Sequence, residues 1–199
     1  MPVEIEAKMK LGASEVEPMI ARLRERGAIP LGQFLETNSF FDTEDRVLLA
    51  ADEGLRVRVM KNLTSGETSA IMTHKGPNLH SQLKRREESE MKVPSAAEAE
   101  RILNCRGYVK CISFQKRRQS WKLDRCRVEI DELPILGFFI EIEGPIEEAV
   151  LSVRQSLGLS ESPPIKAAYS AMLTEYLQER GDSSMDVKFP AATRIAKAG

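Results

Sequence analysis

The sequence has few cysteines, almost no net charge and no long apolar run. Its three cysteines, Cys105, Cys111 and Cys126, are an odd number without CxxC spacing, so they indicate neither a disulfide framework nor a zinc site. A net charge of −1 gives no electrostatic reason to expect nucleic acid or an anionic membrane as the main partner. No apolar run approaches the ~20 residues of a membrane span, and we find no export signal. These absences predict a cytoplasmic protein with reduced thiols.

The length and composition predict one folded domain. With 199 residues, 42% hydrophobic and 30% charged, the chain has room for one domain or for one domain with a tail. We expect the domain over residues 1–180. From Gly181 onward no amphipathic period is visible, which predicts a flexible C-terminal tail over residues 181–199.

The first strand, residues 3–11, alternates charged and apolar side chains. Because successive side chains of a strand point to opposite faces, Glu4, Glu6, Lys8 and Lys10 share one face, and the apolar residues share the other. A half-exposed surface strand would show the same alternation. The mixed acidic and basic pattern recurs at residues 55–59, 128–131 and 138–143, however, and this repetition favours a shared charged interior.

Periodicity, turn residues and capping motifs place the remaining elements. Further strands are expected at residues 29–42, 54–61, 68–75, 83–93, 108–121, 122–132 and 137–144, and helices at 14–27, 46–50, 95–107, 146–157 and 165–180. Capping boxes are expected at Ser14 with Glu17 and at Ser95 with Glu98. The apolar residues predicted to face inward in the shorter elements are Leu48, Leu49, Leu83, Met91, Val93, Ile102 and Leu103.

Eight antiparallel strands with interspersed helices predict an α+β fold built on a closed β-barrel. Small barrels fill their interior with side chains or hold one small ligand. A barrel with a charged lumen and helices packed outside satisfies both the charged and the apolar strand faces, since the helices cover the apolar faces.

The charged lumen predicts a site for a metal and a polyphosphate. Buried charges are costly unless they are paired, so many of them in one cavity imply water or a highly charged ligand. Arginine and lysine suit phosphate oxygens, and clustered carboxylates suit Mg²⁺ or Mn²⁺. The lumen set comprises the bases Lys8, Lys10, Arg56, Arg58, Lys75, Arg86, Lys116 and Arg118 and the acids Glu4, Glu6, Glu88, Glu90, Glu129, Asp131, Glu141 and Glu143.

Seven segments in order resemble the CYTH superfamily, the triphosphate tunnel metalloenzymes. The first is Glu4-Ile5-Glu6-Ala7-Lys8, similar to the ExExK motif, and the others contain Phe40 to Thr43, Leu55 to Arg58, Thr73 to Pro77, Arg86 to Glu90, Lys116 with Arg118, and Glu129 to Glu143. Lys166 with Tyr169 and Ser170 resembles the C-terminal helix motif. One departure is His74, which stands where the family often has an aromatic residue.

The resemblance implies divalent-metal-dependent attack on a triphosphate. It implies Lys8, Glu6 and Arg58 as catalytic residues. The implied phosphate-binding residues are Lys8, Lys10, Arg56, Arg58, Lys75, Arg86, Lys116, Arg118 and Lys166. The implied ligands of Mg²⁺ or Mn²⁺ are Glu4, Glu6, Asp131, Glu141 and Glu143, with Glu129 as a weaker candidate.

Three functions remain open at this point. The preferred one is hydrolysis of inorganic triphosphate, thiamine triphosphate or a nucleoside triphosphate, because water as the attacking group needs no placement of a sugar. A class IV adenylyl cyclase, which converts ATP to cyclic AMP and pyrophosphate, is the alternative, and a non-catalytic polyphosphate- or nucleotide-binding module is the second alternative. We expect a monomer or homodimer whose partner is a small-molecule triphosphate.

Overall fold

The structure is a computed structural model that describes residues 3–79 and 83–190, without the side chains of Val3 and Glu4. Its strands are β1 (Val3–Leu11), β2 (Ile29–Asp42), β3 (Gly54–Asn62), β4 (Thr68–Lys75), β5 (Lys84–Val93), β6 (Val109–Leu123), β7 (Cys126–Leu133), β8 (Gly137–Gly144) and β9 (Asp186–Val187). Its helices are the 3-10 helix η1 (Ala13–Glu15) and the α-helices α1 (Val16–Glu25), α2 (Val47–Ala50), α3 (Ala96–Cys105), α4 (Glu147–Ser156) and α5 (Tyr169–Glu179).

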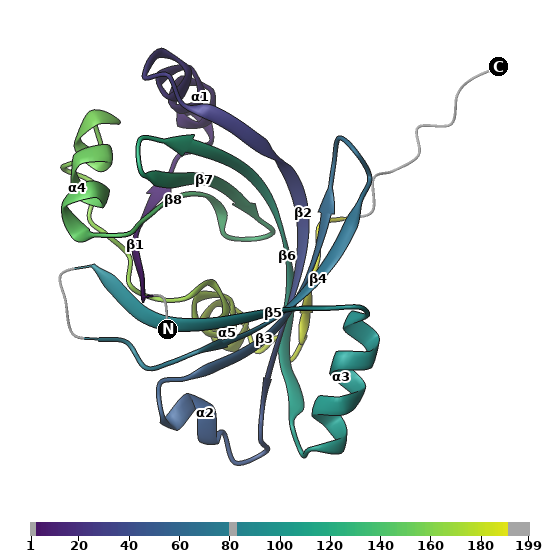
Figure 1. The fold of residues 1–199 in the computed structure, drawn as a ribbon. Helices are drawn as coiled ribbons and strands as arrows, with labels where there is room; N and C mark the ends of the chain where they lie inside the picture. Colours follow the sequence, from purple (N-terminus) through teal and green to yellow (C-terminus); the bar gives the residue numbers. More distant parts are fainter. Residues whose placement is uncertain (1–2, 80–82, 191–199) are drawn as a thin grey trace.

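The first eight strands close into an antiparallel barrel (Figure 1). The strand order is β2-β3-β4-β5-β1-β8-β7-β6, and a long pairing of β2 with β6 joins the two ends of the sheet. The predicted eight-stranded barrel is therefore confirmed. The predicted alternation is also confirmed in β1, where Ile5, Ala7, Met9 and Leu11 are buried in the outer core and Lys8 is buried on the opposite, inner face.

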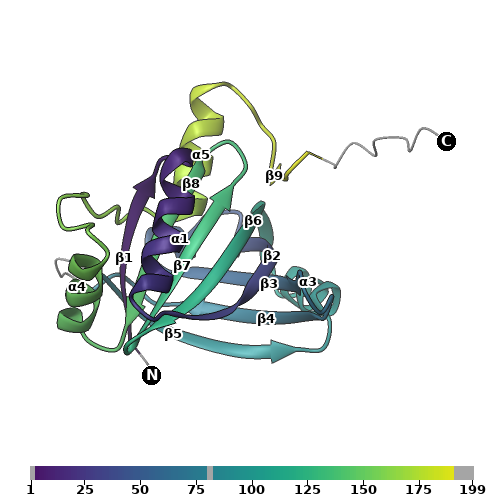
Figure 2. The same ribbon diagram turned by 90° about the horizontal axis from the view of Figure 1, so that it is seen from above.

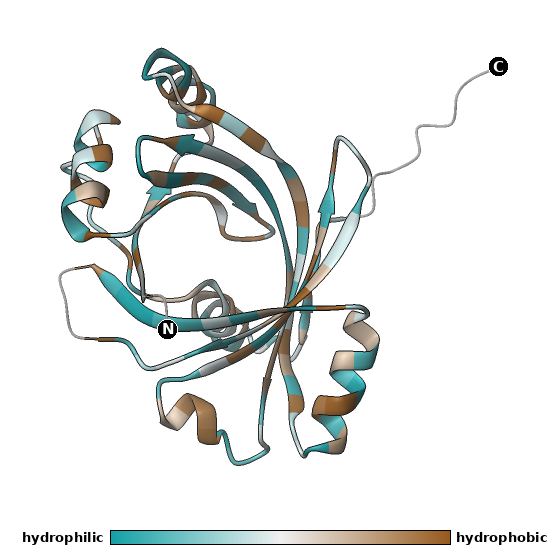
Figure 3. Cartoon of the chain, viewed as in Figure 1, coloured by the Kyte–Doolittle hydropathy of each residue, from teal (hydrophilic) through white to brown (hydrophobic). Residues whose placement is uncertain are grey.

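Helices cover the apolar outer faces of the strands. One large core joins the outer faces of β1, β7 and β8 to α1 and α4, through residues such as Leu23, Ile142 and Val150. A smaller core joins α3 to β2 and β3 through Leu103, Phe41 and Val57. Figure 3 shows the hydrophobic and hydrophilic residues interspersed along strands and helices, as two-faced elements require.

Helix α5 lies across one end of the barrel (Figures 1 and 2). Its Leu173 and Leu177 pack in one cluster with Ile112, Phe114 and Phe139. Phe114 is four residues from Arg118 on β6, and Phe139 is two residues from Glu141 on β8, so both rings lie on the inner strand faces. This apolar cluster therefore occupies the end of the lumen. The charged part of the tunnel begins one layer further in.

The C-terminal segment adds a short parallel strand to the sheet. β9 pairs with β6 at Ser113 and Phe114, and the amide of Phe189 donates to Gln115 Oε1 at 3.1 Å. Residues 186–187 of the expected flexible tail are thus part of the sheet. Residues 191–199 lie outside the described part of the chain.

Some local predictions are wrong at element ends. α1 begins at Val16 rather than at residue 14, and the capping contact is made by Gly12, whose amide donates to Glu15 Oε2 at 2.6 Å, and not by Ser14 with Glu17. The Ser95 cap of α3 is confirmed, since its hydroxyl accepts from the amide of Glu98. The β6–β7 turn falls at residues 124–125, where Asp124 has the left-handed φ of 53° that a tight turn needs.

Several side chains predicted to be buried are exposed. Leu49 is 71% exposed, because α2 is held by the Asp42 carboxylate, which accepts from the amides of Leu48 and Leu49, and not by an apolar face. Ile102 and Met91 are also exposed, at 55% and 54%, and neither belongs to the core under α3, which Val93 at the end of β5 does contact. Leu83 and Leu103 are buried as predicted.

Helix α5 starts at Tyr169, not at residue 165. The preceding residues are extended, and the amide of Ile165 donates to the carbonyl of Lys8 at 2.7 Å. This backbone bond ties the segment before α5 to a part of β1 that β5 does not pair with.

No helix in residues 3–79 and 83–190 is both long and apolar enough to cross a membrane.

Candidate functional site

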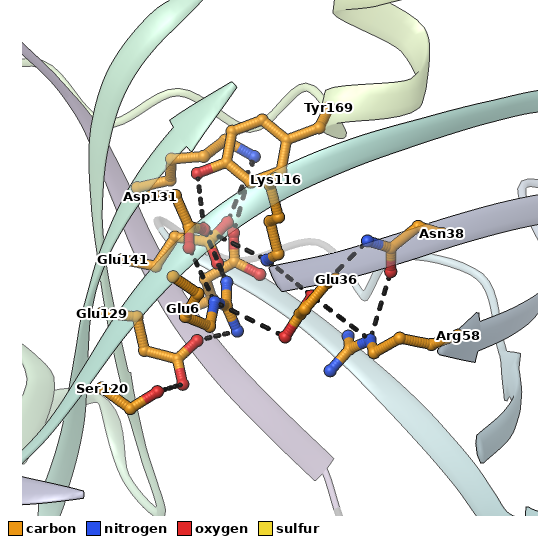
Figure 4. Close-up of polar contacts among 12 residues, drawn as sticks. Glu6, Glu36, Asn38, Arg58, Lys116, Ser120, Glu129, Asp131, Glu141 and Tyr169 are labelled. Atoms are coloured by element: carbon orange, nitrogen blue, oxygen red, sulfur yellow. Dashed lines mark hydrogen bonds and ion pairs between the residues drawn. The ribbon is translucent and has the colours of Figure 1, made fainter. Parts of the chain in front are cut away.

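Arg118 of β6 is the centre of a buried charge network inside the barrel. Figure 4 shows its partners Glu129, Asp131 and Glu141 close together. Its Nε and Nη2 donate to the two carboxylate oxygens of Asp131 at 2.7 and 2.6 Å, and Nη2 also donates to Glu141 Oε2 at 2.5 Å. Nη1 contacts Glu129. Burial opposes the charge, but Asp131 and the other carboxylates outweigh it and raise the pKa of Arg118 well above its ordinary value. Arg118 therefore stays charged in the interior.

Two buried lysines flank this network. Lys116 Nζ donates to Asp131 Oδ2 at 3.1 Å and lies 3.5 Å from Glu36 Oε2. Lys8 is 1% exposed, and its Nζ lies 3.6 Å from Glu6 and 3.8 Å from Glu141. Burial lowers the pKa of both lysines, although their carboxylate neighbours oppose the shift. A bound polyanion would compensate the positive charges of these desolvated lysines.

Tyr169, the first residue of α5, forms the floor of the charged part. Its hydroxyl donates to Asp131 Oδ2 at 3.2 Å. The ammonium groups of Lys8 and Lys116 lie 4.4 and 5.4 Å from the centre of its ring, within the range of a cation–π contact. Burial, reinforced by Glu141 and Asp131, raises the pKa of Tyr169 well above its ordinary value, so its hydroxyl keeps its proton and remains a donor.

Arg56 and Arg58 of β3 form a second basic patch on the inner wall. Arg58 Nε donates to Asn38 Oδ1 at 3.1 Å and lies 3.6 Å from Glu36. Arg56 Nη2 donates to Thr73 Oγ1 at 3.0 Å and to Glu90 Oε1 at 3.3 Å. Burial and the neighbouring Arg58 lower the pKa of Arg56 to about 10, which still leaves it charged at neutral pH.

The other predicted phosphate-binding residues have partners outside the network around Arg118 or lie near the ends of the barrel. Lys75 is paired with Glu88, and Arg86 contacts Asp52, which lies just after α2. Lys10 is exposed, contacts the carbonyl of Leu136 and lies 4.1 Å from the centre of the Phe139 ring, so it belongs to the end covered by α5. Lys166 is exposed in the segment leading into α5, and the Glu4 side chain lies outside the described part.

Sequence reasoning missed two inner residues, Glu36 and Lys84. Glu36 is 1% exposed, and Lys116, Arg58 and Arg118 together hold its pKa far below the ordinary value in spite of its burial. Lys84 donates to Glu6 Oε2 at 3.0 Å, and Glu6 and Glu141 raise its pKa against the effect of burial. Glu36 shares one face of β2 with Asn38 and Phe40, so the period-2 alternation of the strand indicates that Glu36 faces inward. Lys84 shares a strand face with Arg86 and Glu88 in β5, so the same alternation indicates it.

The predicted metal-side carboxylates fit a hard cation in part. Glu6 and Glu143 are directly paired across β1 and β8, and Glu6 Oε1 accepts no hydrogen bond from any described residue. Burial raises the pKa of Glu143, Arg127 and Arg118 oppose this shift, and Glu6 and Glu141 reinforce it. A divalent cation would compensate this excess of negative charge. Within residues 3–79 and 83–190, no three such groups are yet close enough to share an ion, since Lys8 lies between Glu6 and Glu141.

The tunnel opens into a cavity of about 830 Å³ at the end opposite α5. Its described lining comes from four parts of the barrel: Glu88, Ser89 and Glu90 of β5, Glu143 to Pro145 at the end of β8, Lys122, Arg125, Cys126 and Arg127 around the β6–β7 turn, and Leu31 of β2. No aromatic residue is in this lining. We call this cavity the mouth.

A sequence profile of the CYTH domain matches residues 2–168, which is most of the chain. The chain belongs to the CYTH domain family. The matched range ends just before Tyr169 and therefore includes the eight barrel strands that carry the charge network.

Three known proteins illustrate what this CYTH domain is similar to. A protein of Methanocaldococcus jannaschii, provisionally named an adenylate cyclase, is 24% identical over an alignment of 176 residues that covers 84% of this chain and 96% of the relative. The PH1819 protein from Pyrococcus horikoshii OT3 has a TM-score of 0.75 at 22% identity, over 87% of this chain and 99% of the other. HpAC1 from Hippeastrum, provisionally named an adenylyl cyclase and described as having a dominant triphosphatase activity, has a TM-score of 0.65 at 18% identity, over 92% and 97% of the two chains.

Proposed function

We propose that this CYTH domain is a divalent-metal-dependent hydrolase of triphosphates, with inorganic triphosphate as its best substrate. The observation that carries the proposal is a basic cluster in which the buried Lys8, Lys116 and Arg118 and the partly buried Arg58 converge on one part of the tunnel. Catalysis of phosphoryl transfer depends mainly on positioning and on neutralising the charge of the transferred group. Such a cluster, shielded from bulk water, supplies both.

In this proposal the tunnel exchanges its internal ion pairs for pairs with the ligand. The basic side chains leave their carboxylate partners and bind phosphate oxygens, with Arg118 and Arg58 as forks and Lys8 and Lys116 as point charges. Glu6, Glu141 and Glu143, with Glu4 and Asp131, would hold Mg²⁺ or Mn²⁺. A bound divalent cation would neutralise phosphate charge and make water a better nucleophile. Tyr169 keeps Lys8 and Lys116 in place from below.

The lining of the mouth supports hydrolysis over cyclisation. A cyclase must hold the sugar of ATP so that its 3'-hydroxyl attacks the α-phosphate, and nucleobases are commonly bound by stacking on aromatic rings. The described residues of the mouth offer charged groups and no ring. The name of the Methanocaldococcus jannaschii relative keeps adenylyl cyclase as the second candidate. A non-catalytic binder is disfavoured, because a simple anion binder has no need of the carboxylates.

A product assay with Mg²⁺ or Mn²⁺ tests the proposal. Inorganic triphosphate, thiamine triphosphate and ATP are each incubated with the enzyme, and products are separated by chromatography. We expect turnover of inorganic triphosphate at least as fast as that of ATP, and ADP with phosphate from ATP, because adenosine adds little transition-state binding. Cyclic AMP and pyrophosphate as main products would establish the cyclase. Binding without any turnover would establish the binding module.

A variant series links the activity to the cluster. Arg58→Gln should raise KM for triphosphate or lower kcat/KM at least tenfold, since a charge-assisted contact is lost. Arg101→Gln is the matched control, because Arg101 is 67% exposed on α3, remote from the tunnel. Equal activity of both variants would remove Arg58 from the site.

A further inference from the structure

The β6–β7 turn carries three cations at the mouth. Lys122 and Arg127 are directly opposite each other in the register of the two strands, and Arg125 lies in the turn between them. Like charges at directly opposed strand positions repel each other. Two like charges therefore stand at opposed positions here, and a bound anion would offset their repulsion.

These cations face the tunnel and stand on a rigid support. Lys122 has the inward parity of Arg118 on β6, and Arg127 has that of Asp131 on β7. The other face of the turn is anchored in the main core, where Leu123, Cys126 and Val128 are almost fully buried. All three cations line the mouth.

Their pairing differs from that of the deeper bases. Lys8, Arg58, Lys116 and Arg118 each have a carboxylate within 4 Å, whereas Lys122, Arg125 and Arg127 have none among the side chains that the structure describes. The two carboxylates on the β5 side of the mouth, Glu88 and Glu90, are paired with Lys75 and Arg56. Glu143 is the register neighbour of Arg127, and it is the carboxylate that we assign to the metal.

We propose that Lys122, Arg125 and Arg127 form an outer anion subsite that binds the phosphates of a linear inorganic polyphosphate beyond the third. The inference rests on the proposed triphosphate site and extends it outward. Lys122 is four residues beyond Arg118 on β6, about 13 Å at the rise of a strand. A triphosphate held by Lys8, Lys116 and Arg118 leaves the outer subsite empty, and a longer chain occupies both.

The test compares chain lengths in the full-length protein with Mg²⁺. Purified inorganic triphosphate, tetraphosphate and longer linear polyphosphates are titrated calorimetrically and assayed for phosphate release. In the wild type, Kd should fall and kcat/KM should rise roughly five- to tenfold once the chain extends past three phosphates, and this gain should shrink at high salt, because exposed charges are screened. The variant Lys122→Gln with Arg125→Gln and Arg127→Gln should lose the gain and keep the wild-type values for triphosphate.

Each other result has a defined meaning. Arg106→Gln, a change in an exposed cation after α3, is the control and should keep the whole profile. If the wild type neither binds nor hydrolyses triphosphate, the proposed function fails. If it does so but shows no gain with chain length, or if the triple variant keeps the gain, the outer subsite fails and the proposed function stands. ATP in place of tetraphosphate should show no gain, because adenosine carries no further phosphate.

Discussion

Glu6 and Glu143 stand directly opposite each other on β1 and β8, and both side chains face the tunnel. Two neighbouring carboxylates that are partly buried repel each other, and burial already raises the pKa of Glu143. Lys8 and Lys84 neutralise Glu6, and Arg127 is the register neighbour of Glu143. Glu6 therefore has two ammonium groups within 4 Å, whereas Glu143 has no cation that close among the described side chains and is the less compensated of the two.

The first prediction follows from this imbalance. Glu143→Gln should leave the thermal stability of the metal-free protein unchanged or slightly higher, since it removes a poorly compensated charge. It should also weaken Mn²⁺ binding by tenfold or more in calorimetry and abolish metal-dependent turnover. Glu161→Gln, on an exposed residue, should behave like the wild type. Undiminished Mn²⁺ binding by Glu143→Gln would take Glu143 out of the metal site.

The second prediction concerns the order of ligand binding. The deep bases are paired with the carboxylates that we assign to the metal. Binding of triphosphate alone would therefore leave the carboxylates without a compensating charge, and binding of metal alone would leave the bases without one. Mg²⁺ and triphosphate together should raise Tm by more than the sum of the separate shifts. At a hundredfold excess of ligand over Kd the added stability is about 2.7 kcal/mol. Additive shifts in scanning calorimetry would contradict the exchange of ion pairs.

The third prediction concerns Glu36, which is buried between Lys116 and Arg58. Glu36→Gln should destabilise the fold by about 3–5 kcal/mol, because it leaves buried cations without compensation. The bases depress the pKa of Glu36 in the folded state, so its stabilisation is complete above the ordinary pKa of a glutamate, about 4.3, and is lost as the pH falls toward the depressed value. The difference in unfolding free energy between wild type and variant should thus shrink in acid. Urea unfolding at a series of pH values measures it.

The fourth prediction separates the two contacts of Tyr169. Tyr169→Phe keeps the ring under Lys8 and Lys116 and loses only the hydrogen bond to Asp131, which retains two basic partners, so the cost should be about 1 kcal/mol in stability. Tyr169→Leu removes the aromatic face as well and should lower kcat/KM for triphosphate further. If both variants have the same kcat/KM, the ring does not position the lysines.

The barrel was predictable because its signal repeats. Strands such as β1 and β8 alternate charged and apolar residues with period 2, and a shift by one residue would place charges in the core. The cluster around Arg118 was predictable for the same reason, since inner-face parity is set by the sequence once the strand is known. The departures arise where contacts between distant segments decide. Asp42 holds α2 without burying Leu49, and the bond from Ile165 to Lys8 delays the start of α5.

Which acid pairs with which base in the site was not predictable from the alternation of strand faces. The sequence places Glu36, Lys84 and Lys116 on inner faces, but which base neutralises which acid depends on side-chain reach across the closed barrel. Arg86 is an example, because its contact with Asp52 in the turn after α2 joins parts of the chain that no local pattern connects.

The position of α5 has a consequence for how a polymeric substrate would be handled. Because Leu173 and Leu177 of α5 pack in one cluster with Phe114 and Phe139 at one end, we expect the channel to be blind there, with the mouth as its entrance. A chain cannot thread through a blind channel from one side to the other. It must enter by a terminus, be cut there, and back out past the same residues together with the released phosphate. Shortening of a long chain would therefore be distributive, with every intermediate length appearing in solution.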